Sequence, residues 1–432
     1  MEFNFLGKAF KGDKVIWCIF IALCTVSLLE VFSATSTIAY RHQNHWSPIL
    51  RHGAFLLIGF FVVMFLQRIP SRFFSLLLLG IPISVILLIA TLFIGEDVNG
   101  AHRWLGIGAF TIQPSEFAKI SAIGFVAFFL SKMKPENENW IFKTLIIVIA
   151  ILCLLIAPEN LSTACLLFGV CFLMMFIGQV KFKKLAMIAL IGVAGVGLLL
   201  GSLTILPDDV AKQYLPDRLA TWKGRIERHS DDKQVAITDL NEDGTLAYKI
   251  TDENYQVSHA KIAIANNPSI TFFGGKYSTP GGLIGLPGSG TERDFLPQAY
   301  SDFIFAIILE EMGLLGGLFV LLLYLMLMIR CGVLASKCEK KFPRYLILGA
   351  GLILTIQALA NMAVAVNLIP VTGQPLPLIS RGGTSTIITC AYFGIILACS
   401  SKLNESEHED VDESIANVDF ESFDSMEQKM EG

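Results

Sequence analysis

The sequence predicts an all-α integral membrane protein with about ten transmembrane helices and one large external loop between helices seven and eight. Hydrophobic residues make up 53% of the 432 residues and charged residues only 16%, and the mean hydropathy is +0.61. A soluble chain of this length would not sustain such a composition. Apolar runs of about 20 residues recur, which is the length of helix that crosses a bilayer. They lack the alternation of barrel strands, so we expect helices.

The apolar runs set the predicted domain organisation. Spans are predicted at 15–34, 53–67, 74–94, 115–131, 141–157, 161–178, 185–206, 302–329, 344–366 and 384–400. The corresponding regions are a cytoplasmic N-terminus (1–14), helices one to seven (15–206), a large extracytoplasmic loop (207–301), helices eight to ten (302–401) and an acidic cytoplasmic tail (402–432). The first run is as long as a true span, so we expect no cleaved signal peptide.

Basic residues between the spans predict the orientation. With the N-terminus inside, the short outside segments hold only Arg41, Arg51, Arg103 and Arg381, and the other basic residues between spans lie inside, apart from those of the large loop. The positive-inside rule therefore places both termini in the cytoplasm. All nine cysteines fall in predicted spans or inside segments, which argues against a disulfide framework. The net charge of −4 gives no sign of a nucleic-acid partner.

Polar residues gather between the third and fourth spans. Gln113 stands just before a predicted helix start, and Glu116 and Lys119 follow on one face of that helix. Ionisable residues at this depth are costly and usually face a cavity, here beside Arg103 and Trp104. A simpler interpretation makes Trp104 an interfacial anchor, lets Arg103 snorkel, and pairs Glu116 with Lys119. Under the cavity hypothesis, replacing Arg103 or Lys119 by Ala should weaken substrate use and leave folding largely intact.

A second charged segment precedes the eighth span. A loop rich in glycine carries Arg293 and Asp294, and Asp302 opens the span itself. Asp302 could serve only as a helix cap that interacts with the positive end of the helix dipole. Alternatively, Asp294 and Asp302 could hold a divalent cation, although no His accompanies them.

Two further external segments have unusual composition. Residues 367–385 contain three prolines and three glycines, which is typical of a re-entrant or tightly turned loop that lines a cavity. The alternative is a rigid connector. Residues 158–163 form a short turn with Glu159 and Asn160, whose simplest role is to cap the sixth span.

Together, these segments resemble motifs of the SEDS family (shape, elongation, division and sporulation), the polytopic peptidoglycan polymerases of the FtsW and RodA type. NGAHRWL with IQPSEFAK is similar to the family's NGA-x-RW and QP-S/A-E-x-x-K loop. FLPQAYSDFIFAIILEEMGLLG resembles LPEAHTDFIFAVIAEELG, PVTGQPLPLISRGGTS resembles PTKGLTLPLISYGGSS, and NYQVSHAKIAIANN resembles GYQ-x-x-QS-x-x-AI. The resemblance covers about residues 13 to 401, and RLATWKGRIERH favours the division-type FtsW branch over RodA.

Several residues depart from the family motifs. Tyr300 and Ser301 stand where the family has His-Thr, so no catalytic His is expected at 300. In the loop before the last span, Thr372 replaces a Lys and Arg381 replaces a Tyr. An insertion at 231–249 is longer than is usual for the family.

The resemblance implies an inverting peptidoglycan glycosyltransferase of the bacterial inner membrane, at the division septum. It would polymerise lipid II and release undecaprenyl pyrophosphate, with Asp302 as the catalytic base. The implied substrate-binding residues are Arg103, Trp104, Gln113, Glu116, Lys119, Arg293, Asp294, Ser380 and Arg381. The implied partners are a class B penicillin-binding transpeptidase and other division proteins. Catalysis with a divalent cation at Asp294 and Asp302 and catalysis by a base and cationic side chains alone are both allowed.

Two other functional classes remain open. A flippase of lipid-linked precursors also needs a polar cavity among many spans, but it does not need a carboxylate poised at the outer surface. A non-catalytic scaffold that recruits a transpeptidase would make the charges of the loops dispensable.

The first testable prediction concerns topology. A reporter inserted at residue 240 should lie outside and one at residue 137 inside, because basic residues concentrate in alternate segments. Cysteine labelling with a reagent that does not cross the membrane measures this directly. Finding both reporters on the same side would break the arrangement of about ten spans.

Overall fold

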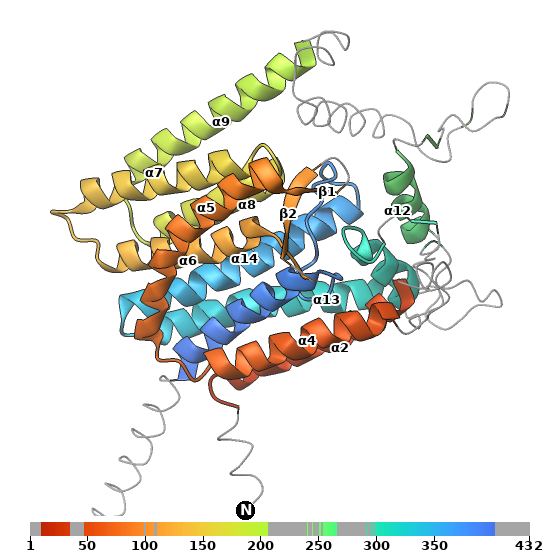
Figure 1. Ribbon diagram of the computed structural model, residues 1–432, viewed down its shortest axis with the longest axis horizontal. Coiled ribbons are helices and arrows are strands. Elements are labelled where there is room, and N and C mark those ends of the chain that lie inside the picture. Colours follow the sequence, from red (N-terminus) through yellow and green to blue (C-terminus); the bar gives the residue numbers. More distant parts are fainter. Residues whose placement is uncertain are drawn as a thin grey trace, which may run out of the picture.

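The computed structural model describes residues 10–34, 47–98, 101–107, 110–205, 240, 244, 250–251, 254–265, 292, 295–296 and 299–401. Within these residues, eight helices are long and apolar enough to cross a membrane, and Leu161–Ile177 is a shorter apolar helix. Most helices lie side by side with similar axes (Figure 1). The predicted helical membrane fold is confirmed, whereas the count of about ten spans stays a prediction.

The elements follow one another along the chain in a simple order. The helices are α2 (Lys14–Ala34), α4 (Ser47–Leu66), the 3₁₀ helix η1 (Ser71–Leu79), α5 (Gly80–Ile94), α6 (Pro114–Ser131), α7 (Glu138–Ile156), α8 (Leu161–Ile177), α9 (Phe182–Ile205), α12 (Tyr255–Ala265), α13 (Ile304–Lys337), α14 (Lys341–Ala365) and a last helix, Gly383–Ser401. Every predicted span therefore has a helical counterpart. The main differences are that α4 begins about two turns early and α13 ends about two turns late, where the added turns carry polar residues that hydropathy does not detect.

The bundle has a buried centre and an apolar outer surface. In α6 and α14, 78% and 72% of the most apolar window is buried, against 28% in α4. Outer helices instead expose large apolar side chains, such as Phe93 at the end of α5 and Phe65 on α4. Such a surface is stable only against lipid, and the polar residues of the chain are left to the centre.

Small residues let the central helices approach closely. A Cβ at Gly124 on α6 would lie 2.6 Å from the Cβ of Leu77 on η1, and one at Gly349 on α14 would lie 2.6 Å from Ile123. Close backbone approach of this kind drives helix association in lipid, where apolar side chains gain little by leaving the solvent.

Helix α13 is interrupted at Gly313. This residue has φ 77° and ψ −176°, a conformation that side chains with a Cβ rarely adopt. The interruption separates a short first part, which carries Glu310 and Glu311, from the long remainder of the span. The first part can therefore take its own direction at the end of the bundle where α13 begins.

A small antiparallel sheet, which the sequence did not predict, lies between α5 and α6. Its strands are β1 (Glu96–Val98), β2 (Ala101–Ile107) and β3 (Phe110–Ile112), in the order β1-β2-β3. Thr384 donates a hydrogen bond to the carbonyl of Thr111 at 2.9 Å, which ties the sheet to the start of the last helix.

Both ends of the described chain meet at one end of the bundle. The backbone N–H of Asp13 donates to Ser400 Oγ at 3.0 Å, and Arg330 grips the Asp13 carboxylate with two nitrogens. Burial would raise the pKa of the Asp13 carboxyl, but hydrogen bonds from Arg330 and the N–H of Ile16 outweigh it and hold the pKa below its usual value. This placement supports an even number of spans.

Close packing yields a stability prediction. A Cβ at Gly59 on α4 would lie 2.4 Å from Cys390 Sγ in the last helix, so Gly59→Ala should lower stability by about 1 to 3 kcal/mol. The melting temperature in detergent measures the loss, and Cys390→Ala should recover part of it. Gly53→Ala on the same helix is the matched control, because nothing lies within 4 Å of its added Cβ. Equal melting of the Gly59 and Gly53 variants would contradict the close approach of α4 to the last helix.

Candidate functional site

A polar cavity of about 480 Å³ opens at the end of the bundle opposite Asp13. It lies where the starts of α4, α6 and α13 meet the sheet and the loop before the last helix. The lining residues are Arg51, His52, Phe55, Trp104, Thr111, Gln113, Glu116, Tyr300, Ser301, Asp302, Gly373, Gln374, Pro375, Arg381, Gly382, Gly383 and Ser385. Half of the residues predicted for the site, namely Trp104, Gln113, Glu116, Asp302 and Arg381, thus share one cavity.

Asp302 lies immediately before α13 and lines the cavity. Its Oδ1 accepts a hydrogen bond from Ser301 Oγ at 2.9 Å, and its carbonyl accepts one from Asn361 on α14 at 2.8 Å. The N-cap of α13 is Phe303, where no side chain caps the helix. The position of Asp302 therefore favours a role in the cavity over a role as the helix cap.

Two guanidinium groups line the same cavity. Arg381 donates its backbone N–H to the Tyr300 carbonyl at 2.9 Å, and its guanidinium lies over the Tyr300 ring at 5.2 Å. Burial lowers the pKa of Arg381 below its usual value, and Arg51 lowers it further, while Tyr300 acts in the opposite direction. Neither Arg51 nor Arg381 pairs with a carboxylate among the described residues. Like charges gathered in this way favour an anionic ligand.

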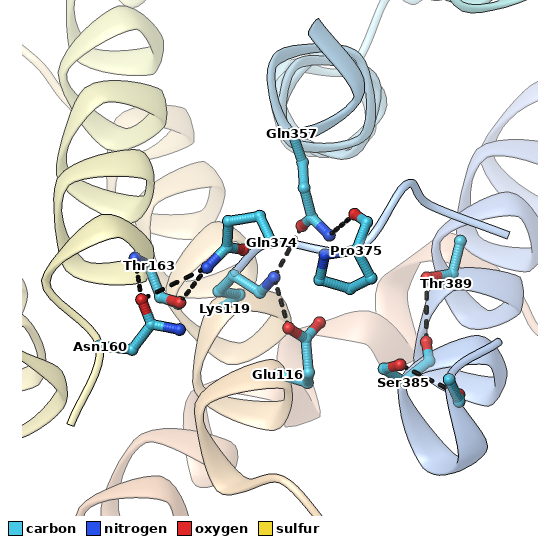
Figure 2. A network of polar contacts seen from close by, with 10 residues as sticks. Glu116, Lys119, Asn160, Thr163, Gln357, Gln374, Pro375, Ser385 and Thr389 are labelled. Atoms are coloured by element: carbon cyan, nitrogen blue, oxygen red, sulfur yellow. Dashed lines mark hydrogen bonds and ion pairs between the residues drawn. The ribbon is translucent and has the colours of Figure 1, made fainter. Parts of the chain in front are cut away.

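Lys119 lies behind the cavity wall. Its Nζ lies 2.7 Å from Glu116 Oε1 and 2.8 Å from Gln357 Oε1, and the residue is fully buried (Figure 2). Of this pair, only Glu116 lines the cavity. The predicted i,i+3 pairing is present, and Lys119 is the buried counter-charge of Glu116. Substrate contact by Lys119 stays a proposal that this geometry does not favour.

The loop from residue 366 to 382 is fixed by side chains of α14. Gln357 donates to the Pro375 carbonyl at 3.1 Å, and Asn361 donates to the Gln374 carbonyl at 2.8 Å. Gln374 in turn donates to Thr163 Oγ1 at 2.6 Å, beside Asn160 in the turn before α8 (Figure 2). Asn160 caps α8 through the N–H of Thr163, as the sequence predicted. The loop is thus a rigid wall of the cavity.

Ser380 stabilises this wall from inside the loop. Its hydroxyl donates to the Ser301 carbonyl at 2.6 Å and accepts the N–H of Leu376 at 2.8 Å. Both interactions are internal, and the residue is buried. A substrate contact by Ser380 stays a proposal, whereas its role in joining the loop to the segment of Asp302 is visible.

The structure does not describe the side chains of three predicted site residues. Arg103 belongs to strand β2, but its side chain is not described, and Arg293 and Asp294 lie outside the described residues. Within the described part of the chain, no group of three or more His, Cys, Asp or Glu residues could hold a metal ion. The proposed pairing of Asp294 and Asp302 about a cation is thus untested.

Sequence reasoning missed several residues of the cavity. Arg51 was counted only as an outside charge, and its neighbour His52 and the loop residue Gln374 were not singled out. The available signal was position, because Arg51 and His52 lie directly before a predicted span. Gln374 gave no such signal, because its hydrogen bond with Thr163 joins residues 211 positions apart in the chain.

The fold and the cavity define a polytopic helical membrane protein with a charged cavity at one end of its bundle. Residues 13–405 match the model of the FtsW, RodA and SpoVE family, which is described as a cell cycle protein family. The chain belongs to this family, since the match covers most of its length.

Relatives of known name agree with this assignment. The chain is 28% identical over 388 residues to the probable peptidoglycan glycosyltransferase FtsW of Pseudomonas fluorescens (strain SBW25), covering 87% of this chain and 85% of that protein. It is 28% identical over 404 residues to stage V sporulation protein E of Bacillus subtilis (strain 168), covering 91% and 98%.

Solved structures share the fold. A chain from a study of how a peptidoglycan synthase complex coordinates polymerization and crosslinking has a TM-score of 0.66 at 21% identity, covering 91% of this chain and 98% of that one. The rod shape determining protein RodA of Thermus thermophilus has a TM-score of 0.58 at 20% identity, covering 90% and 96%.

The Glu116–Lys119 pair yields the next prediction. Lys119→Met leaves the buried Glu116 carboxylate without its counter-charge, and stability should fall by about 3 to 5 kcal/mol. The double variant with Glu116→Gln should regain much of this, because no unpaired charge then remains. Thermal unfolding in detergent measures both, and Lys143→Met on the exposed face of α7 is the matched control. Wild-type melting of the Lys119 single variant would refute the buried pair.

Proposed function

We propose that this protein is a peptidoglycan glycosyltransferase that polymerises lipid II and releases undecaprenyl pyrophosphate. The observation that carries the proposal is that the Asp302 carboxylate shares a cavity with two guanidinium groups, Arg51 and Arg381. Family membership and the named FtsW relatives support the same reaction. A base and a site for a leaving anion are the two things that this glycosyl transfer needs.

In the proposed mechanism, Asp302 acts as the general base. The 4-hydroxyl of the acceptor sugar attacks C1 of the donor sugar and gives its proton to the Asp302 carboxylate. The new C1–O4 bond forms as the bond between C1 and the phosphate oxygen breaks, with inversion at C1. The hydrogen bond from Ser301 and the carbonyl contact with Asn361 orient the carboxylate.

The cations of the cavity stabilise the departing pyrophosphate. Arg51 and Arg381 can each bind phosphate oxygens through two N–H groups. Arg103 and Arg293 remain proposed additional cations. Lys119 contributes indirectly, since it holds Glu116 in place.

The remaining predicted residues would bind the sugars. Trp104 can stack on a sugar face, and Gln113 and Glu116 offer amide and carboxylate groups to sugar hydroxyls. Asp294 would orient the acceptor, or hold a divalent cation together with Asp302. In that case the cation would add to the positive charge that binds the pyrophosphate.

The cellular setting is part of the proposal. We place the chain in the bacterial inner membrane at the division septum, with both termini cytoplasmic, in a complex with a class B penicillin-binding transpeptidase and other division proteins. The charge distribution supports the orientation. The solved structure that deals with polymerization and crosslinking supports such a partner.

The decisive prediction concerns Asp302→Asn. An amide cannot accept the hydroxyl proton at neutral pH, so polymerisation should fall by about a hundredfold to ten-thousandfold. Lipid II binding and the melting temperature should stay near wild type, because Asn keeps the shape and can still accept from Ser301. The assay is gel-resolved glycan polymer made from lipid II by purified protein, with and without the transpeptidase.

The control is a carboxylate-to-amide change at the other end of the bundle. Glu136→Gln lies in the exposed turn before α7 and should polymerise normally. Near-normal glycan synthesis by Asp302→Asn would remove Asp302 as the base. Lipid II movement across vesicles without any polymer, unchanged by Asp302→Asn, would favour the flippase instead.

A further inference from the structure

His52 occupies a position in the cavity that the proposed mechanism does not use. It lies in the early part of α4, directly after Arg51, and lines the cavity although only 1% of its surface is exposed. Its Nε2 lies 2.8 Å from Ser27 Oγ, and Ser27 is not among the lining residues. One ring nitrogen is therefore bound behind the wall, and Nδ1 is left as the polar atom that the ring can present to the cavity.

The contacts of Ser27 define which nitrogen carries the proton. Ser27 Oγ lies 3.0 Å from the Ile379 carbonyl, which can only accept, so the single hydroxyl proton goes to that carbonyl. Ser27 Oγ must then accept a hydrogen bond from His52, and Nε2 carries a proton. In the neutral ring, Nδ1 holds a lone pair.

The charges around His52 favour the neutral ring. Arg51 and Arg381 share its cavity, and their guanidinium groups are both positively charged. Of the two carboxylates that line the cavity, Glu116 is already paired with Lys119, and Asp302 accepts from Ser301. Tyr300 is occupied beneath the Arg381 guanidinium. A second proton on Nδ1 would add a third positive charge to the cavity beside the two guanidinium groups.

An acceptor at this point selects a particular part of a ligand. An ionised pyrophosphate has no proton to donate, whereas a sugar offers hydroxyl groups and an acetamido N–H. We infer that His52 is a positioning residue whose Nδ1 accepts a hydrogen bond from the sugar bound next to the pyrophosphate, while Arg51 and Arg381 hold the pyrophosphate. This inference rests on the proposed function, since it assigns the sugar part of the same lipid-linked ligand.

Two substitutions of His52 test the roles of its two ring nitrogens separately. The amide nitrogen of Gln can reach the place of Nε2, so His52→Gln keeps a donor for Ser27 and loses the acceptor in the cavity. The shorter Asn places its amide oxygen near Nδ1, so His52→Asn keeps the acceptor and loses the contact with Ser27. A residue with a merely structural role would tolerate Gln better than Asn, and the inference requires the opposite order for sugar binding.

The experiment measures dissociation constants of two ligands for the full chain in nanodiscs. The ligands are lipid II, which carries the sugars, and undecaprenyl pyrophosphate, which does not. His52→Gln should bind lipid II about 2- to 12-fold more weakly, the value of one neutral hydrogen bond, and should bind undecaprenyl pyrophosphate as wild type does. His52→Asn should restore lipid II binding, and Arg381→Gln should weaken both ligands.

Equal effects of His52→Gln on both ligands, or no effect on either, would overturn the inference. If His52→Gln melts well below wild type, then wild-type protein is tested with lipid-linked sugars that lack one hydroxyl or the acetamido N–H at a time. At least one of these analogues must bind about 2- to 12-fold more weakly than intact lipid II, and His52→Ala must no longer distinguish the two. Uniform binding of all the analogues overturns the inference.

The outcomes also separate this inference from the proposed function. If the wild-type protein forms no polymer while His52→Gln weakens the binding of lipid II but not that of undecaprenyl pyrophosphate, the proposed polymerase is contradicted and the sugar contact of His52 is supported. If wild-type protein polymerises lipid II and His52→Gln has the same KM and affinity as wild type, the polymerase is supported and the sugar contact of His52 is contradicted.

Discussion

Polar groups inside an apolar bundle must find partners, and that constraint organises the end of the protein that holds the cavity. The loop from 366 to 382 brings irregular backbone deep among helices, where each unpaired carbonyl would cost several kcal/mol. Gln357 and Asn361 on the buried helix α14 satisfy the carbonyls of Pro375 and Gln374. Because α14 is packed in the centre of the bundle, hydrogen bonds to α14 hold the loop in one conformation. The cavity has a fixed wall for this reason.

The same constraint separates the charges of the site into two kinds. Glu116 and Lys119 are buried and neutralise each other, with Gln357 as a third partner, so this pair adds no net charge to the cavity. Arg51 and Arg381 line the cavity without a carboxylate partner among the described residues. The site therefore favours an anion, because a bound anionic ligand would neutralise the positive charge of these two residues.

Sequence reasoning recovered the parts of this design that are local. Helices follow from apolar runs, and Glu116 with Lys119 follows from i,i+3 spacing, so both were predictable. The depth of Lys119 was not, because it depends on how closely α14 packs against α6. The sheet between α5 and α6 also escaped prediction, since two of its three strands have only three residues each. His52 escaped because Ser27 and Ile379, which define its role, lie far away in the chain.

Two residues that depart from the family motifs, Tyr300 and Arg381, contact each other in the structure. The sequence has Tyr300 where the family has a His, and Arg381 where the family has a Tyr, and these two residues contact each other through the backbone and through ring and guanidinium. An aromatic face beneath a guanidinium stabilises it, whereas a protonated His would repel it. With Thr372 in place of the family's loop Lys, Arg381 is the cation that this loop contributes to the cavity. The Tyr300 ring therefore stabilises the half-buried guanidinium of Arg381, and the loop keeps a cation at the cavity although that cation stands at a different position from the family's Lys.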